Sequence, residues 1–303
     1  MIYVTGRTDF TIEERTAITL GKFDGIHRGH QELLKRIKEK SPGLSTLVLT
    51  FDMSPAAFVK HEKESLITTN DERRHVVEAF GIDYLYEMSF TDQVMNLEAA
   101  DFVRKVVKDL NVAYIAVGKD FRFGHKRAGD YKLLIDMAEE CGYEIEIIDK
   151  LMYRAREISS TYVREMIANG DIETANSLLG YPFSVIGTVG YGRQLGRTIG
   201  IPTANVIPLD TKLLPPNGVY VSKVRIGDRT YGGVTNIGVK PTVGDKNEKG
   251  AETYIFDFNQ NIYGQEITLE LYYYVRPEKK FEFIDDLKYQ MELDIQFAKN
   301  YLS

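Results

Sequence analysis

Two histidines three positions apart are the first groups in the chain suited to act on a phosphate. They close the string Leu20-Gly21-Lys22-Phe23-Asp24-Gly25-Ile26-His27-Arg28-Gly29-His30, which follows an expected strand and opens an expected helix. An α/β sheet binds phosphates at such a junction, where backbone N–H groups and the helix N-terminus face the anion. Gly25 and Gly29 would let the backbone approach a ligand, and both histidines would donate hydrogen bonds to a polyphosphate whose α-phosphate gains charge during transfer. The alternative is a pair of surface histidines in a glycine-containing turn.

A second group places hydroxyls and a guanidinium at a helix start. The string Glu157-Ile158-Ser159-Ser160-Thr161-Tyr162-Val163-Arg164 offers three hydroxyls and, one turn later, an arginine. Such groups suit phosphate oxygens, although a helix N-cap followed by a surface arginine gives the same pattern.

A third group lies in the second half of the chain. Gly187-Thr188-Val189-Gly190-Tyr191-Gly192-Arg193-Gln194-Leu195-Gly196-Arg197 is a glycine-rich, basic loop that leads into Thr198-Ile199-Gly200-Ile201-Pro202-Thr203-Ala204-Asn205. Backbone amides in a glycine-rich turn can cradle phosphates, so we expect phosphate contacts from Gly187, Gly192, Arg193, Gly196 and Arg197, and also from Thr203 just beyond the turn. The Thr203 hydroxyl and the Asn205 carboxamide are hard oxygen ligands suited to Mg²⁺, and their spacing places both on one face of an extended segment.

The elements that position the first two groups alternate between strand and helix. Buried strands are expected at 17–20, 45–50, 84–86, 114–117 and 144–148, with amphipathic helices at about 29–40, 71–80, 98–109 and 130–140. This alternation predicts a doubly wound parallel α/β sheet, a Rossmann-like domain.

The pattern changes after two short helices, from about Ser160 to Ala168 and from Asp171 to Leu179. From Phe183 onward, short strands with turns predict a small antiparallel barrel, closed by a helix from about Phe283 whose stripe is Leu287, Met291, Ile295 and Ala298. We therefore expect two domains, residues 1–181 and 182–303.

Bulk composition narrows the class of protein. A chain of 303 residues suits two domains, and its net charge of -6 argues against nucleic acid as a partner. The lone Cys141 suits a reducing cytoplasm. No apolar run approaches the roughly 20 residues that span a bilayer, and the N-terminus lacks signal-peptide features, so no membrane partner is expected.

The first two strings resemble signatures of the cytidylyl- and adenylyltransferase superfamily. The resemblance implies that Gly21, Phe23, Asp24, Gly25, Gly29, Ser159, Ser160, Thr161 and Arg164 contact ATP and that His27 and His30 are catalytic. Val117-Gly118-Lys119-Asp120-Phe121-Arg122-Phe123-Gly124 looks like the segment that shapes the flavin pocket of flavin adenylyltransferases, which makes Asp120, Phe121 and Phe123 flavin contacts, or else packing aromatics in a loop. Family members often carry a Pro-His-Pro-like string where this chain has Thr50-Phe51-Asp52-Met53-Ser54-Pro55, and only the second proline is kept.

The third string resembles the riboflavin kinase signature, which implies a six-stranded barrel. Further matches follow in the family's order, among them Glu252-Thr253-Tyr254-Ile255 and Val275-Arg276-Pro277-Glu278-Lys279-Lys280-Phe281. The resemblance makes Glu252 the base that deprotonates the riboflavin 5′-hydroxyl, with an edge-strand carboxylate as the alternative. Arg276 and Glu278 are then flavin contacts or an exposed charged turn.

Together the strings resemble prokaryotic bifunctional riboflavin kinase/FMN adenylyltransferases over essentially the whole chain. This implies that ATP and Mg²⁺ serve both sites and that riboflavin, FMN and FAD are the other ligands. Two alternatives stay open: a chain with one working site, or a flavin-sensing protein whose old catalytic surfaces only bind.

Overall fold

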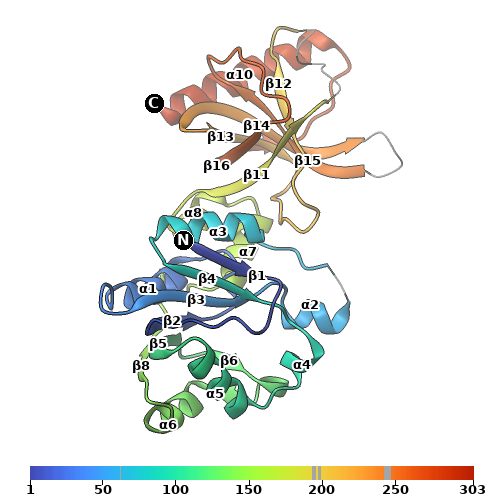
Figure 1. Cartoon of the computed structure of the whole chain (residues 1–303). Coiled ribbons are helices and arrows are strands. Elements are labelled where there is room, and N and C mark those ends of the chain that lie inside the picture. The colour runs from blue at the N-terminus through green and yellow to red at the C-terminus, as the bar shows by residue number, and fades with distance from the viewer. Residues whose placement is uncertain (62, 193–195, 197–198, 242–246) are drawn as a thin grey trace. The chain divides into compact units, whose positions relative to one another are not determined.

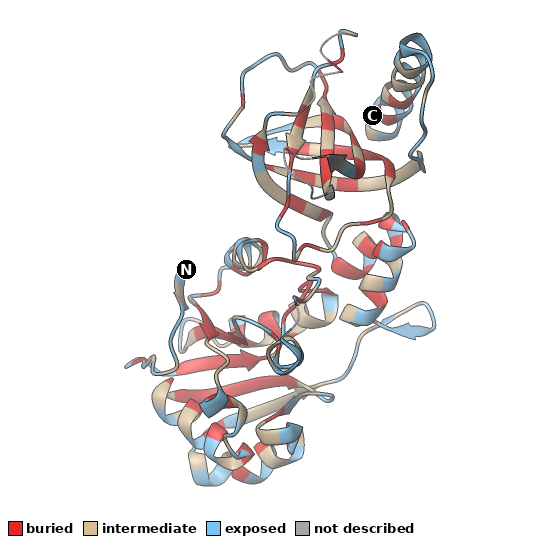
Figure 2. Cartoon of the chain, turned by 90° about the vertical axis from the view of Figure 1, so that its right-hand side faces the viewer, coloured by how far each residue is buried: buried red, intermediate tan, exposed pale blue. Residues whose placement is uncertain are grey.

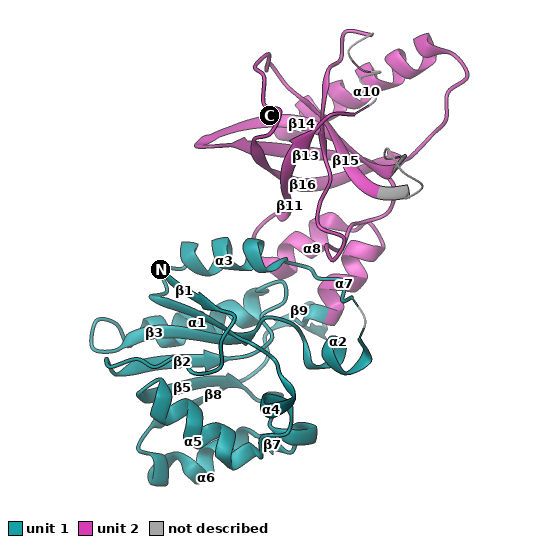
Figure 3. Cartoon of the chain, turned by 45° about the vertical axis from the view of Figure 1, so that its right-hand side comes forward, with its two compact units in different colours: residues 1–160 teal, residues 161–303 magenta. Residues whose placement is uncertain are grey.

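The computed structural model describes residues 1–61, 63–192, 196, 199–241 and 247–303 in two compact units. The first unit is Met1–Ser160 and the second is Thr161–Ser303 (Figure 3). The helices α7 (Ser160–Ala168) and α8 (Ile172–Leu179) fall almost wholly in the second unit. One reason is that the Asn176 side chain of α8 bonds to the barrel, donating to the Leu271 carbonyl at 2.9 Å and accepting the Phe183 N–H at 2.7 Å. The compact units thus divide earlier than the expected functional boundary at 181/182, which stays a prediction.

The first unit is built on a parallel sheet of six strands in the order β1-β4-β3-β2-β5-β8 (Figure 1). The strands are β1 (Ile2–Thr5), β2 (Thr16–Leu20), β3 (Ser45–Phe51), β4 (Tyr84–Met88), β5 (Val112–Gly118) and β8 (Glu144–Ile148). Every residue of β2 is buried, as expected for a central strand covered on both faces (Figure 2). The predicted doubly wound α/β fold is confirmed.

Helices cover both faces of this sheet. On one face α1 (Arg28–Lys38) and α3 (Asn70–Ala79) bury Leu34, Ile37 and Val77 against the strands. On the other, α5 (Ala99–Asp109) and α6 (Tyr131–Cys141) bury apolar residues such as Phe102 and Leu134. Short elements that we did not expect are α2 (Pro55–Lys60), α4 (Asp92–Met95), a 3₁₀ turn at His125–Arg127, and the hairpins β6 (Arg122–Phe123) with β7 (Gly129–Asp130) and β9 (Met152–Tyr153) with β10 (Arg156–Glu157).

The second unit contains a closed antiparallel barrel of six strands in the order β11-β12-β15-β14-β13-β16. The strands are β11 (Phe183–Gly190), β12 (Thr203–Val206), β13 (Gly218–Ile226), β14 (Arg229–Pro241), β15 (Asn247–Ile255) and β16 (Glu266–Pro277). Buried hydroxyls inside it satisfy one another, since Thr235 donates to Ser222 at 2.7 Å and bonds Thr253 at 2.8 Å. The predicted barrel is confirmed, including its six strands.

The terminal helix α10 (Ile284–Leu302) packs on the outside of the barrel. Ile295, Ala298 and Leu302 contact an apolar cluster that includes Val221 and Phe256. This agrees with the stripe expected from Ile295 and Ala298. Among the described residues, none of the helices combines the length and apolar character needed to cross a membrane.

Candidate active sites

The histidine turn joins the end of β2 to the start of α1 in the first unit. His27 caps α1, where its Nδ1 accepts the His30 backbone N–H at 3.4 Å. The two imidazole rings stack with centroids 3.8 Å apart and an interplanar angle of 16°. A Cβ on Gly29 would lie 3.2 Å from the His27 ring, a tight contact, so glycine leaves the imidazole room to fold back over the helix start. The structure thus brings together both predicted histidines and Gly29.

Buried contacts set the shape of this turn. Gly25 has φ +79°, and a Cβ there would meet Ile67 at 2.8 Å. Its N–H donates to Thr68 Oγ1 at 2.9 Å, while the Asp24 carboxylate accepts the Ile67 N–H at 2.8 Å. Phe23 and Asp24 are only 0% and 1% exposed, so their side chains hold the turn, and any contact with ATP falls to their backbone groups.

Burial makes both histidines neutral near pH 7. It lowers the pKa of His27 to about 4, against an opposite pull from the Asp120 carboxylate, and it lowers the pKa of His30 well below its usual range. Because His27 Nδ1 accepts a hydrogen bond, its proton is on Nε2, which is thereby free to donate. His30 Nδ1 is buried and has no hydrogen-bond partner among the described residues. The site therefore holds two neutral imidazoles, of which His27 carries its proton on Nε2 as a hydrogen-bond donor.

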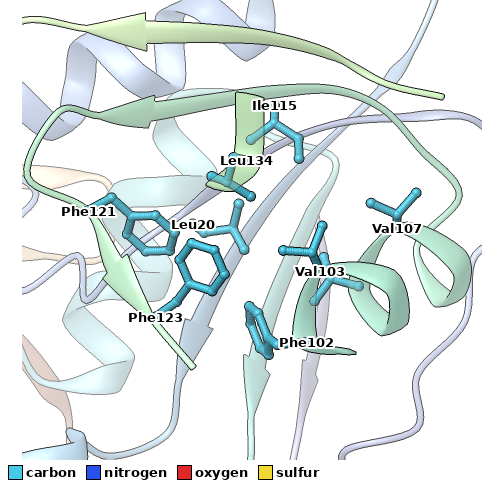
Figure 4. A pocket seen from close by; sticks show the side chains of 9 residues that line it. Leu20, Phe102, Val103, Val107, Ile115, Phe121, Phe123 and Leu134 are labelled. Carbon is cyan, nitrogen blue, oxygen red and sulfur yellow. The ribbon is translucent and has the colours of Figure 1, made fainter. Parts of the chain in front are cut away.

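The segment after β5 divides into a polar and an apolar part. Asp120 acts electrostatically on His27, so the structure brings it to the histidine turn, and it pairs with Lys150 at 3.2 Å. The rings of Phe121 and Phe123 stack at 5.3 Å instead, and Phe123 packs against Phe102 (Figure 4). With Leu20, Val103, Ile115 and Leu134 among others, they line a cavity of about 10 Å³, room for at most one water. Their environment agrees with the packing alternative, and their flavin contacts remain a prediction.

Ser160 of the hydroxyl string is hydrogen-bonded to the histidine turn. Ser160 Oγ donates to the Asp24 carbonyl at 2.8 Å, which links the two predicted ATP motifs within the first unit. Ser159 precedes it, whereas Thr161 and Arg164 belong to the second unit on α7. Contacts of these four residues with ATP stay a prediction.

The departure from the Pro-His-Pro-like string has a local structural role. Ser54 caps α2, where its hydroxyl accepts the Ala57 N–H at 3.2 Å, and Pro55 occupies the first turn. Asp52 Oδ1 accepts the Phe90 N–H at 3.0 Å. The altered residues therefore form an ordered strand-to-helix connection after β3.

Arg73, a buried arginine near the same loops, was not among the site residues predicted from the sequence. Arg73 on α3 pairs with Glu87 on β4, and its guanidinium also points at the ends of β2 and β3. The sequence does contain a signal for the start of α3, the capping box formed by Thr69 and Glu72. It contains none for the burial of Arg73, because charged helix residues are usually solvated.

The second candidate site lies on the outer face of the barrel. In the registers of β12, β15 and β14, Glu252 stands opposite Asn205 on one side and Asn236 on the other. Thr203 Oγ1 donates to Glu252 Oε1 at 2.6 Å. The structure thus assembles the predicted base and both predicted metal ligands into one row of oxygen-bearing side chains, and adds Asn236.

Two glycines of the basic string, Gly192 and Gly196, lie close to residues of this row. A Cβ on Gly192 would stand 2.4 Å from Asn205 Cγ, and one on Gly196 would stand 3.4 Å from Thr203 Oγ1 and 2.2 Å from the Ile201 carbonyl. A Cβ on Gly187 would stand 2.7 Å from Val206 Cγ1. The predicted phosphate contacts Arg193 and Arg197 lie outside the described residues.

Two predicted flavin contacts, Arg276 within the last two residues of β16 and Glu278 just after it, have different surroundings. Arg276 forms a two-point ion pair with the buried Asp294 of α10, at 3.0 Å from Nε and 2.7 Å from Nη2. It therefore fastens the terminal helix to β16. Glu278 accepts hydrogen bonds from Asn217 at 3.3 Å and from Asn236 at 3.4 Å, which connects it to the Glu252 row. Glu278 itself is exposed, so the choice between a flavin contact and an exposed charged turn stays open for it.

Comparison with known proteins assigns each unit to a family. The family model for FAD synthetase matches residues 9–162, and that for riboflavin kinase matches residues 179–302. The bifunctional riboflavin kinase/FMN adenylyltransferase of Bacillus subtilis is 37% identical over 96% of this chain and 94% of its own length. The protein of the same name from Escherichia coli is 36% identical over 95% and 93%.

One solved structure resembles the whole chain. A crystal structure described as a macrolide-efflux protein from Streptococcus pneumoniae has a TM-score of 0.88 and 32% identity, and the alignment covers 99% of this chain and 98% of that one. That description names a transport role, whereas the two family models and the curated relatives are named for enzymatic activities.

Proposed function

The chain belongs to the bifunctional riboflavin kinase/FMN adenylyltransferase family, and we propose that it carries out both reactions of FAD synthesis. The barrel phosphorylates riboflavin to FMN with ATP, and the parallel-sheet unit transfers the adenylyl group of ATP to FMN, giving FAD and pyrophosphate. The observation that carries this conclusion is the presence of two separate sites, the stacked histidines and the Glu252 row, each within the matching family region. We also propose a cytoplasmic location, which the single cysteine favours.

At the barrel we assign proton transfer to Glu252. Its carboxylate accepts the proton of the riboflavin 5′-hydroxyl, whose oxygen then bonds to the γ-phosphorus of ATP. The bond from that phosphorus to the β,γ-bridging oxygen breaks, so FMN and ADP are formed. The Thr203 hydroxyl donates to one oxygen of this carboxylate and so helps to hold it in place. Asn205 and Asn236 stand on either side of Glu252 in the register.

The residues beside Glu252 fit Mg²⁺ by the chemistry of their donors. The Thr203 hydroxyl donates a hydrogen bond to Glu252, so the lone pairs of its oxygen can face a cation, and Asn205 offers a carboxamide oxygen. Mg²⁺ prefers such oxygens and is commonly held by few protein ligands together with substrate phosphates. When bound, it would neutralise charge on the transferring phosphate. Thr203 and Asn205 are therefore the residues we propose to hold it.

At the histidine turn we assign charge stabilisation. A phosphate oxygen of FMN bonds to the α-phosphorus of ATP, the bond to the α,β-bridging oxygen breaks, and pyrophosphate leaves. No proton has to be removed from the attacking phosphate, so imidazoles are needed as donors and not as bases. His27, neutral with its proton on Nε2, is suited to donate to the α-phosphate. Gly25 and Gly29 serve this arrangement indirectly, because they leave room for Ile67 and for the His27 ring and so let the turn hold the imidazole in place.

The test is a product assay on the full chain and two variants. With riboflavin, ATP and Mg²⁺ we expect transient FMN followed by FAD. Glu252→Gln should abolish riboflavin phosphorylation and spare FAD formation from supplied FMN, whereas His27→Ala with His30→Ala should leave FMN as the terminal product.

The two alternatives predict different products. FMN alone from the unmodified chain would mean that only the kinase works, and would direct attention to the altered Phe51–Pro55 segment. Riboflavin recovered unchanged would contradict both activities and favour a flavin-binding protein. Normal kinase turnover in Glu252→Gln would contradict the base assignment alone.

A further inference from the structure

A charged pair is buried beneath the adenylyltransferase site. The side chains of Arg73 on α3 and Glu87 on β4 are only 4% and 0% exposed, and Arg73 Nε donates to Glu87 Oε1 at 2.9 Å. The other carboxylate oxygen of Glu87 accepts the Tyr3 hydroxyl at 2.8 Å. Both charges are therefore paired and hydrogen-bonded, as burial of a charge requires.

The remaining N–H groups of Arg73 extend to the ends of two strands. Nη1 donates to the Lys22 carbonyl at 3.4 Å, and Nη2 donates to Asn70 Oδ1 at 2.9 Å and lies 3.5 Å from the Phe51 carbonyl. Lys22 comes two residues after β2, and Phe51 is the last residue of β3. The guanidinium thus bridges two neighbouring strand ends at the carboxyl edge of the sheet, the edge where open α/β sheets bind ligands.

The Lys22 carbonyl is held from two sides. Thr50 Oγ1 donates to it at 3.2 Å in addition to Arg73. The next residue, Phe23, has φ +48°, a left-handed conformation that a bulky residue adopts only where its surroundings impose it. From there the chain runs through Gly25 to His27. Fixing the Lys22 carbonyl therefore fixes the start of the turn that carries the histidines.

Stability alone does not account for this arrangement. A buried ion pair contributes little or nothing compared with well-packed apolar residues of similar size, because both ions lose their hydration. What the pair does supply is a planar guanidinium with several donors at fixed angles, which can orient more than one acceptor at once. The guanidinium can therefore fix the orientation of the backbone carbonyls at the two strand ends.

We propose that Arg73 is a positioning residue for adenylyl transfer, held by Glu87 and acting through the Lys22 carbonyl on the orientation of His27. The inference rests on the proposed function of the histidine turn. A displacement of about 1 Å at reacting groups can lower a rate by about 100-fold, so loss of this support acts mainly on turnover.

The test compares Arg73→Lys with Arg74→Lys. Lysine at 73 keeps a positive charge beside Glu87 and cannot reach Lys22, Phe51 and Asn70 together. Arg74 is the adjacent residue on α3, partly exposed, and pairs with Asp71, which makes its substitution the matched control. FAD formation from FMN and ATP is measured with kcat and KM separated, and riboflavin phosphorylation by the same chain is the internal control.

For Arg73→Lys we expect kcat for FAD formation to fall by about tenfold to 100-fold, with the KM values for ATP and FMN changed by less than about threefold. Riboflavin phosphorylation should be unchanged, and Arg74→Lys should match the unmodified chain in both reactions. A lower melting temperature with kcat per folded molecule intact would overturn the proposal, because it would show a purely structural role.

Thr50→Val covers the case in which Arg73→Lys does not fold. It removes the second hydrogen bond to the Lys22 carbonyl at nearly constant volume and should lower kcat for FAD formation by about threefold to tenfold. An unchanged kcat in this variant would overturn the proposal. Failure of the unmodified chain to make FAD would refute the adenylyltransferase function itself, and this inference with it, whereas an active chain with unaffected variants would refute the inference alone.

Discussion

The burial of His27 predicts that the first unit loses stability as the pH falls. His27 is 7% exposed, and burial lowers its pKa to about 4 from an ordinary value near 6.5. Below about pH 6.5 the His27 imidazole is protonated in the unfolded chain and still neutral in the folded chain. The free energy of unfolding therefore decreases as the pH falls, until about pH 4, below which His27 is protonated in both states. The stability supplied by the neutral imidazole is therefore present at pH 7 and lost on acidification.

The magnitude follows from the two pKa values. Between pH 7 and pH 5 the contribution of His27 amounts to a loss of about 2 kcal/mol in the free energy of unfolding, with a slope that approaches about 1.4 kcal/mol per pH unit. His27→Asn is the appropriate variant, since asparagine is a good N-cap that can accept the His30 N–H and does not titrate. We expect this variant to have a pH dependence that is weaker by that amount.

The assay must report on the first unit, because two units need not unfold together. Hydrogen exchange of peptides from β2 and α1, followed by mass spectrometry at increasing urea, gives a local free energy of unfolding at each pH. Comparison of the two chains cancels the titration of every other group that the substitution leaves unperturbed. An identical pH slope in His27→Asn would refute the claim that burial holds this imidazole neutral.

Three further predictions concern other parts of the structure. Gly25→Ala forces a Cβ against Ile67 at φ +79° and should destabilise the first unit by about 1–3 kcal/mol and impair FAD formation, as measured by urea unfolding and product assay. Arg276→Met leaves the Asp294 charge buried and should lower the free energy of unfolding of the second unit by about 3–5 kcal/mol, whereas Arg276→Met with Asp294→Leu should recover most of that loss. If the stable double variant binds riboflavin more weakly than the unmodified chain, Arg276 contacts the flavin directly. Thr203→Val should lower riboflavin phosphorylation by at least about tenfold and leave FAD formation from FMN unchanged.

Most of the secondary structure could be predicted from the sequence because it depends on local patterns. The strand at 144–148 and the helix from Ser160 to Ala168 were predicted with the bounds that the structure has, since hydrophobic periodicity and stop signals such as Asn169-Gly170 lie within the segment itself. Short hairpins such as β9–β10 were missed because two-residue strands carry no periodicity.

The sequence predicted only some of the contacts within the candidate sites. His27 and His30 are three positions apart on one helix start, and Thr203 and Asn205 are two positions apart on one strand, so their proximity follows from the geometry of a single element. Phe123 shows the opposite case. Its surroundings depend on α5 and on the strands beneath, so the sequence left open a flavin contact or a packing role; the structure packs it against Phe102, and a flavin contact stays a prediction.

The sequence by itself determined the two fold classes, the order of the motifs and the residue types able to act on phosphates, because these are properties of short stretches of chain. The tertiary structure alone decided which distant residues meet. The barrel register places Glu252 opposite Asn205 and within hydrogen-bond distance of Thr203. The packing of α10 pairs Arg276 with Asp294, and the sheet order brings Arg73 to Glu87 and to the ends of β2 and β3. Such contacts depend on how strands pair and helices pack across long separations in the chain, and no local pattern encodes them.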